Sequence, residues 1–165
     1  WPGKKTLFMG CEFGQWKEWD FNAPLDWALM NAPLHAGLVN LIRDLNRNYS
    51  SHPGWAKSDH QSDKFSWVDC NDRDRQTLSF LRLGEETGET LLVACNFSDR
   101  LVHRDWGCPH PGGWKVLLDT DSPHYGGEGS AGGTVFSSLA NTCDGNPQSL
   151  SFSVGRWSVR ILCPG

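Results

Sequence analysis

The chain has 165 residues, of which 38% are hydrophobic and 21% charged, enough for one or two small domains. A complete (β/α)8 barrel needs roughly 250 residues and is excluded, and no apolar run reaches the roughly 18–20 residues of a membrane-spanning helix. Because the formal net charge is −4, a large cationic surface is also excluded, and we expect neither nucleic acid nor a membrane as a partner.

The first segment combines a short strand with a polar loop. Residues 6–9 are apolar and predict a strand that ends at Gly10, and a loop follows from Cys11 to about Asn31. This loop carries three Trp, two Glu, two Asp and one Gln. Polar groups directly after a strand are typical of ligand-binding positions in α/β barrels, and glycoside chemistry uses paired carboxylates. The alternative is an ordered loop with buried tryptophans that closes one end of a barrel or sheet.

Helical periodicity then predicts one long helix over residues 33–49. Asn31 suits an N-cap, Pro33 suits the first turn, and the run at residues 50–54 predicts the end of the helix. The apolar residues fall on a single stripe, which consists of Leu34, Leu38, Leu41, Ile42, Leu45 and Tyr49.

After residue 52 the pattern changes to short β segments separated by turn residues. Residues 148–154 show it clearly, because Leu150 and Phe152 alternate with serines, as expected for a sheet with one wet face. Residues 84–88 predict a hairpin turn between the second and third of the strands given below. The expected strands are 65–68, 77–83, 90–97, 101–106, 114–118, 134–136, 148–154 and 157–162. This pattern predicts a mainly β fold, an antiparallel β-sandwich over residues 52–165.

Several motifs favour structure over chemistry. The six cysteines are widely and irregularly spaced, so we expect reduced thiols rather than disulfides or a zinc site. The Gly-rich stretch at 126–133 lacks the lysine of a phosphate loop and predicts a surface loop. Asp119 and Asp121 lack the spacing of a calcium loop and are expected to form turns. No metal or cofactor site is predicted.

Ordered motifs resemble a known family over nearly the whole chain. The early ones resemble the end of the catalytic domain in 1,4-α-glucan (glycogen) branching enzymes of the α-amylase superfamily; they are residues 2–10, Glu12-Phe13-Gly14-Gln15, Glu18-Trp19, Leu25-Asp26-Trp27 and Arg43-Asp44-Leu45-Asn46. The later ones resemble landmarks of the C-terminal β domain of that family; they are residues 65–68, 95–98, 119–122, 125–127, 132–134 and 149–152. Cys11 and residues 155–159 depart from the family pattern.

The resemblance implies two parts and a function for the intact enzyme. Residues 1–51 would be the last strand, loop and helix of a (β/α)8 catalytic barrel, and residues 52–165 its C-terminal β-sandwich domain. The intact cytoplasmic enzyme would transfer an α-1,4-glucan segment to a 6-hydroxyl and form an α-1,6 branch of glycogen, without a cofactor. The family's catalytic carboxylates would lie upstream of Trp1. This chain would then contain no catalytic residue, would be inactive alone and would have the rest of the barrel and an α-1,4-glucan as partners.

The position of the loop predicts which side chains face substrate in the intact enzyme. The rim candidates are Glu12, Phe13, Gln15, Trp16 and Trp19. We assign Trp27 to the same segment and expect the remaining tryptophans in the core of the β domain. Two alternatives stay open, a stand-alone α-glucan-binding β module and a purely structural β domain. Without the rest of a barrel, residues 1 to about 50 are expected either to pack on the β domain or to be poorly ordered.

Overall fold

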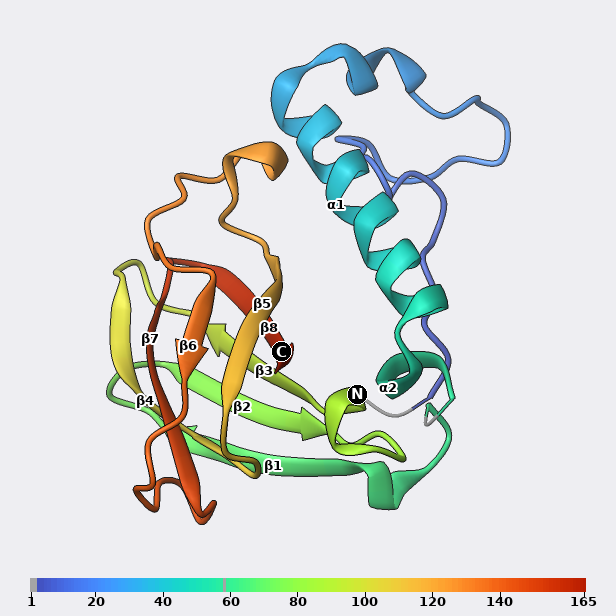
Figure 1. The fold of residues 1–165 in the computed structure, drawn as a ribbon. Coiled ribbons are helices and arrows are strands. Elements are labelled where there is room, and N and C mark those ends of the chain that lie inside the picture. The colour runs from blue at the N-terminus through green and yellow to red at the C-terminus, as the bar shows by residue number, and fades with distance from the viewer. Residues whose placement is uncertain (1–2, 58) are drawn as a thin grey trace.

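Two antiparallel β-sheets and one long helix form the structure (Figure 1), a computed structural model that describes residues 3–57 and 59–165. The larger sheet has the strand order β1-β2-β3-β8-β5-β6, and β4 pairs with β7 in the smaller sheet. The strands are β1 Phe65–Asp72, β2 Thr77–Arg82, β3 Leu91–Asn96, β4 Val102–Cys108, β5 Gly113–Asp119, β6 Val135–Ser137, β7 Gln148–Val154 and β8 Ser158–Pro164. All eight strands expected from the sequence are present, so the prediction of a mainly β, sandwich-like domain is confirmed.

The two sheets enclose the main hydrophobic core. Trp106 from β4 and Phe152 from β7 stack at 5.3 Å between ring centroids, and Trp114 from β5 is fully buried near them. Leu92 and Ala94 reach the same core from β3. The alternation predicted for residues 148–154 holds for the apolar residues and for Ser151, because Leu150, Phe152 and Val154 are buried and Ser151 is exposed, but it is wrong at Ser149, which is fully buried.

A second core lies on the opposite face of the larger sheet, beneath the long helix. Leu91, Val93 and Cys95 point to this side of β3, so all six residues of β3 are buried. This arrangement explains the continuous apolar run at residues 91–95, because a strand covered on both faces needs no polar alternation. Leu41 and Leu45 of the helix pack against this cluster.

The long helix α1 spans Pro33–Ser51, followed by the short α2 over Pro53–Ala56. Pro33 occupies the first turn as predicted, but the N-cap is Ala32 rather than Asn31, with no side-chain cap. The helix runs two residues past the predicted end. It stops at His52, because Pro53 disfavours helical backbone at the residue before it. Four 3-10 turns complete the elements: η1 Trp27–Asn31, η2 Ser62–Lys64, η3 Thr87–Glu89 and η4 Pro123–Tyr125.

The strand predicted at residues 6–9 is absent from this structure, because residues 6–8 have no regular structure and Met9 begins a turn. A β-strand needs a neighbour to accept and donate its ladder hydrogen bonds, and none of the described strands pairs with these residues. Leu7, Phe8 and Met9 are all more than half exposed. An apolar sequence alone therefore does not create a strand.

Helix α1 packs on the β domain. Of the two outcomes expected for residues 1 to about 50, packing on the β domain or poor order, the helix shows the first. It lies along the outer side of the larger sheet and meets the loop after β5 near η4 (Figure 1). At the crossing, a Cβ on Gly37 would lie 2.3 Å from the carbonyl oxygen of Tyr125. Tyr125 also donates from its hydroxyl to Asp44 at 2.9 Å. These contacts fix the helix against the sheet.

The tryptophans divide differently from the expectation. Trp106 and Trp114 are buried in the β domain as predicted, and Trp55 is partly buried against the second core. Trp67 on the edge strand β1 and Trp157 in the turn after β7 are exposed, which is contrary to the prediction. A side chain on an edge strand or in a turn has fewer neighbouring segments to cover it, so even a tryptophan there can stay exposed. The expectation for Trp1 falls outside the described residues.

Candidate functional site

The tryptophan-rich loop (residues 11–31) begins with a tight double turn. Gly10 and Gly14 have φ values of +87° and +67°, a region that glycine enters without steric cost. The backbone N–H of Cys11 donates to the carbonyl of Phe8 at 2.9 Å, and that of Gln15 donates to Gly10 at 3.0 Å. These turns present the side chains that follow toward one end of α1.

Gln15 holds two parts of the loop together. Its Oε1 accepts a hydrogen bond from the backbone N–H of Asp26 at 2.9 Å, and its Nε2 donates to the carbonyl of Lys17 at 3.0 Å. A cavity of about 550 Å³ lies between these parts. Its lining residues are Gln15, Lys17, Glu18, Asp20, Ala23, Pro24, Leu25 and Asp26. The loop thus forms an open cavity of mixed polar and apolar lining, held in shape by the amide of Gln15.

Phe13 supports the loop from inside. Its ring is fully buried and lies 5.3 Å from that of Trp27. The backbone carbonyl of Phe13 lies 2.7 Å from Nδ1 of His35, a hydrogen bond that joins the loop to α1. In this structure the Phe13 side chain therefore anchors the loop and faces no open cavity.

Two exposed indoles flank the loop. Trp16 is 79% exposed and packs edge-on against His35 at 5.3 Å between ring centroids. Trp19 is less exposed and packs edge-on against Phe8 at 5.4 Å. Trp16 thus leaves most of its surface free to stack on a ligand, whereas Trp19 exposes only 38% of its surface.

Among the described residues, the loop carboxylates form no metal-binding group. Asp20 accepts from the backbone and side-chain N–H groups of Asn22, which is a local turn. Glu18, Asp20 and Asp26 line the cavity, whereas Glu12 does not. Among the residues that the structure describes, no three His, Cys, Asp or Glu side chains form a group that would hold a metal ion.

A buried cluster around Asp59 ties the N-terminal segment to the β domain. Asp59 accepts hydrogen bonds from Lys5 at 2.5 Å and Tyr49 at 2.8 Å, and Arg82 lies 3.7 Å away. Burial raises the pKa of Asp59, but the hydrogen bonds from Lys5 and Tyr49 and the nearby cations outweigh burial and hold it below its ordinary value. The hydrogen bond to Asp59 raises the pKa of Tyr49. No sequence motif indicated this cluster.

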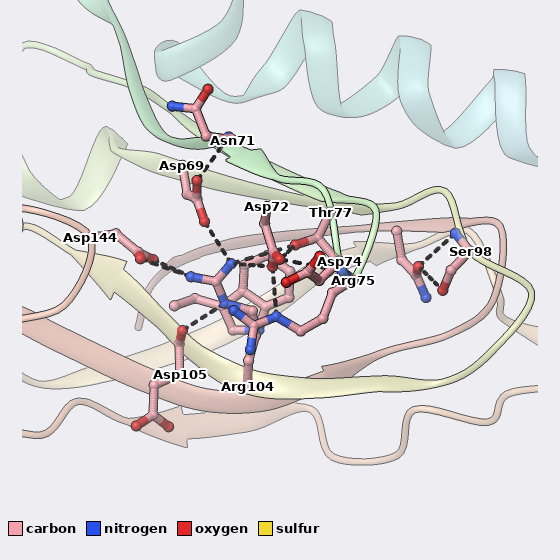
Figure 2. Close-up of polar contacts among 12 residues, drawn as sticks. Asp69, Asn71, Asp72, Asp74, Arg75, Thr77, Ser98, Arg104, Asp105 and Asp144 are labelled. Atoms are coloured by element: carbon pink, nitrogen blue, oxygen red, sulfur yellow. Dashed lines mark hydrogen bonds and ion pairs between the residues drawn. The ribbon is translucent and has the colours of Figure 1, made fainter.

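A second buried cluster surrounds Arg104 on β4 (Figure 2). Its guanidinium donates to Asp69 at 2.9 Å, to Asp72 at 3.0 Å and to both carboxylate oxygens of Asp144 at 2.8 and 2.7 Å. It also lies 4.8 Å above the ring of Trp106. The cluster joins β1, β4 and the loop before β7, and its role is structural, because every carboxylate in it is engaged by the same cation.

The Gly-rich stretch forms a surface loop, as predicted. The loop is built around Asp121, which is buried. Asp121 accepts from the backbone N–H groups of Glu128 at 2.9 Å and Ser130 at 2.8 Å, and from the Ser130 hydroxyl at 2.6 Å. Its own N–H donates to Asp119 at 3.0 Å. The prediction that both aspartates form turns is confirmed.

The cysteines form no disulfide bonds. All six cysteines are free thiols, and burial raises the pKa of Cys95 and of Cys108 to about 11. Within residues 3–57 and 59–165, no helix is both long and apolar enough to cross a bilayer.

Comparisons with known proteins identify relatives of the chain. The family model described as alpha amylase, C-terminal all-beta domain matches residues 67–165. The chain is 40% identical over 164 residues to the 1,4-alpha-glucan branching enzyme GlgB of Rhodospirillum rubrum, which covers 99% of the chain and 22% of that protein. It is 47% identical over 139 residues to the enzyme of the same name from Nitratidesulfovibrio vulgaris, which covers 81% of the chain and 21% of that protein.

A solved structure is also similar. The alpha-amylase from H. orenii aligns with 78% of this chain and 20% of its own, with a TM-score of 0.46 and 14% identity. The chain spans about a fifth of the length of the curated relatives that it matches.

Proposed function

The chain belongs to the family of the alpha amylase C-terminal all-beta domain and matches a C-terminal portion of 1,4-alpha-glucan branching enzymes, and we propose that it works as part of such an enzyme. The observation that carries the proposal is 40% identity over 99% of the chain to one branching enzyme. The similarity runs through the N-terminal loop and α1 as well as the β domain, and this continuity does not favour a stand-alone β module.

The proposed reaction is a retaining transfer. In the intact enzyme, a carboxylate attacks the anomeric carbon of an α-1,4 linkage and forms a glycosyl-enzyme, while a second carboxylic acid protonates the leaving oxygen. A glucan 6-hydroxyl then attacks the same carbon, the second group accepts its proton, and an α-1,6 branch results. We assign neither role to the carboxylates of the loop and propose that the catalytic pair lies on other parts of the enzyme. The proposed setting of the reaction is glycogen synthesis in the cytoplasm.

Residues 1–51 are proposed as the last strand, loop and helix of the catalytic barrel, with residues 52–165 as the C-terminal domain. In the intact enzyme the segment at residues 6–9 would then gain the neighbouring strands that it lacks here. Its exposed apolar side chains support this role. So does an apolar groove of about 370 Å³ between this segment and α1, which Leu7, Ile42 and Trp55 help to line.

The tryptophan-rich loop is proposed as part of the substrate rim. Trp16 and Trp19 would stack on sugar rings, Glu12 would accept hydrogen bonds from sugar hydroxyls, and Gln15 would hold the loop in shape. Phe13 contributes by supporting the loop. The exposed surface of the two indoles supports this proposal, as does the adjacent cavity, which carboxylates and the amide of Gln15 help to line.

A branching assay tests both the function and the rim. The intact protein that contains this chain is expected to introduce α-1,6 branches into amylose, counted as chains released by a debranching enzyme. Trp19→Ala in that protein is expected to lower kcat/KM for amylose roughly tenfold, because one stacking contact of about 1.4 kcal/mol is lost. The isolated 165-residue chain is expected to be inactive.

The control separates a rim residue from a core residue. Trp106→Ala removes a fully buried indole and should lower both activity and melting temperature, whereas Trp19→Ala should lower activity alone. An unchanged kcat/KM, or a Trp19→Ala protein that melts as early as Trp106→Ala, would remove Trp19 from the rim. Branching by the isolated chain would overturn the proposal that the catalytic carboxylates lie on other parts of the enzyme.

A further inference from the structure

Trp157 occupies an unusual position in the β domain. It ends the three-residue connection between β7 and β8, has a φ of +49° and is 66% exposed. Glycine enters this left-handed region freely, whereas a bulky side chain there is uncommon. The backbone N–H of Trp157 donates to the carbonyl of Ser98 at 3.1 Å, which holds the turn in place. Trp157 therefore combines an unfavourable backbone conformation with a solvent-exposed indole.

The turn that carries Trp157 is locked to the Gly-rich loop. A Cβ on Gly155 would lie only 2.5 Å from Oδ2 of Asp121, so the turn packs directly on this buried carboxylate. The same carboxylate accepts the hydrogen bonds from Glu128 and Ser130 that shape the loop. Two segments about 25 residues apart thus share one buried anchor, and the surface between them is preformed.

A groove of about 360 Å³ lies on that surface. The side chains of Glu128 and Arg156 form an ion pair at the groove, both about half exposed. The lining includes Thr120, Tyr125, Gly127, Glu128, Arg156 and Trp157. The groove therefore combines an exposed indole with a carboxylate acceptor and a guanidinium donor that pair with each other. Asp121 also lines the groove, and its carboxylate already accepts the hydrogen bonds of the loop.

We propose that this groove binds an α-glucan chain, with the indole of Trp157 stacked on a glucose ring and Glu128 and Arg156 hydrogen-bonded to its hydroxyls. A sugar ring offers C–H groups on its face and hydroxyls at its edge, which matches an apolar platform flanked by a charged acceptor and donor. The lining holds two carboxylates, of Asp121 and Glu128, and one guanidinium, of Arg156, so it gives no advantage to an anionic ligand and suits a neutral polymer. The choice of α-glucan among carbohydrates rests on the proposed function.

Fluorine NMR of the intact protein tests the groove directly. Tryptophan is replaced by 5-fluorotryptophan, and the resonance that disappears in Trp157→Gly is assigned to Trp157. That variant is expected to fold, because glycine suits the backbone at this position. Titration with maltoheptaose should shift the Trp157 resonance in a saturable way. In Arg156→Gln the same titration should give a dissociation constant roughly tenfold higher, because a charge-assisted hydrogen bond to the sugar is lost.

Retention of the protein in glycogen-containing gels gives a second readout with a matched control. Trp157→Gly should reduce retention, and Trp157→Phe should restore part of it. Gln76 also has a left-handed φ, +56°, in an exposed turn of the same domain, so Gln76→Gly makes the same backbone change elsewhere and should leave retention unchanged. Equal loss of retention in Gln76→Gly would overturn the proposal.

The outcomes separate this groove from the proposed function. If the intact protein branches amylose but maltoheptaose leaves the Trp157 resonance unmoved, the groove proposal fails and the proposed function stands. An equal shift with β-linked cellohexaose also overturns the assignment of an α-glucan. If the resonance shifts with maltoheptaose alone and the intact protein makes no branches, the groove stands and the proposed function fails.

Discussion

Arg104 and Asp59 show how single buried charges hold segments of this chain together. Arg104 engages three carboxylates. Asp59 accepts hydrogen bonds from Lys5 and Tyr49 and lies near a second cation, the guanidinium of Arg82. Removal of one partner from such a cluster leaves the others buried without compensation, which is the costly change in buried ion pairs. Both clusters join residues more than 30 positions apart, so they fix tertiary structure rather than local turns.

The Asp59 cluster makes stability depend on pH. The pKa of Asp59 is lowered below its ordinary value near 3.8 in the folded protein. Between the folded and unfolded pKa values the unfolded chain binds more protons, so the free energy of unfolding falls as pH falls through this window. The contribution is fully present well above pH 4. Urea denaturation between pH 3 and pH 7 should therefore show a smaller pH-dependent loss in Asp59→Asn than in the parent.

The exposed Asp99 supplies the control for this experiment. Asp99→Asn should follow the parent curve, because the same charge is removed at a solvent-exposed position. Asp72 and Asp121 also have lowered pKa values, so part of the acid sensitivity should remain in Asp59→Asn. Identical pH dependence in the parent and Asp59→Asn would contradict the role given to this carboxylate.

At the scale of elements, the contact between α1 and the loop after β5 depends on a missing side chain. Gly37 is the only buried residue of α1, and it faces the backbone of Tyr125. Glycine is a poor helix former, with a cost of about 1 kcal/mol relative to alanine. Its presence in the middle of α1 is explained by the close approach of the two backbones.

Gly37→Ala should therefore destabilise the protein despite its better helix propensity. The new Cβ would lie 2.3 Å from the Tyr125 carbonyl oxygen, so the helix or the loop must move. We expect a loss of about 1–3 kcal/mol in the free energy of unfolding, with faster amide exchange in α1. Gly88→Ala, where a Cβ meets nothing within 4 Å, is the matched control and should be near neutral. A stabilised Gly37→Ala protein would show that the contact is not tight.

At the scale of the whole molecule, the larger sheet is covered on both faces. The smaller sheet covers one face, and α1 covers the other over Val93, Leu118 and Ile161. Loss of the helix would expose the second core to water. Because burial of apolar area contributes roughly 25 cal/mol per Å², this exposure would lower the free energy of unfolding. We therefore expect the β domain to depend on α1 for its stability.

Truncation tests this dependence. A chain that begins at residue 59 should bind a hydrophobic dye such as ANS and aggregate at micromolar concentration, because the second core becomes solvent-exposed. A chain that begins at residue 33 keeps α1 over the sheet and should bind little dye. Equal dye binding by the two chains, or a monomeric and dye-free chain from residue 59, would show that α1 is dispensable for the fold.

The sequence by itself determined the elements whose signal is local. Helical periodicity located α1, and short β segments bounded by turn residues located the eight strands, because both signals repeat at short range along the chain. Turn chemistry located the Asp121 loop, because an aspartate side chain bonds its own neighbouring backbone. The same logic failed at residues 6–9, since a strand exists only beside a partner that local sequence does not reveal.

Only the tertiary structure decided which side chains are covered. Phe13 and Trp16 lie three residues apart in one polar loop, yet one is fully buried and the other is exposed. Trp157 and Trp114 both lie in the β domain, and only Trp114 is core. The clusters of Arg104 and Asp59 join distant residues without a motif. Burial and charge pairing depend on which segments meet in space, and that is set by the packing of sheets and helix rather than by the order of residues.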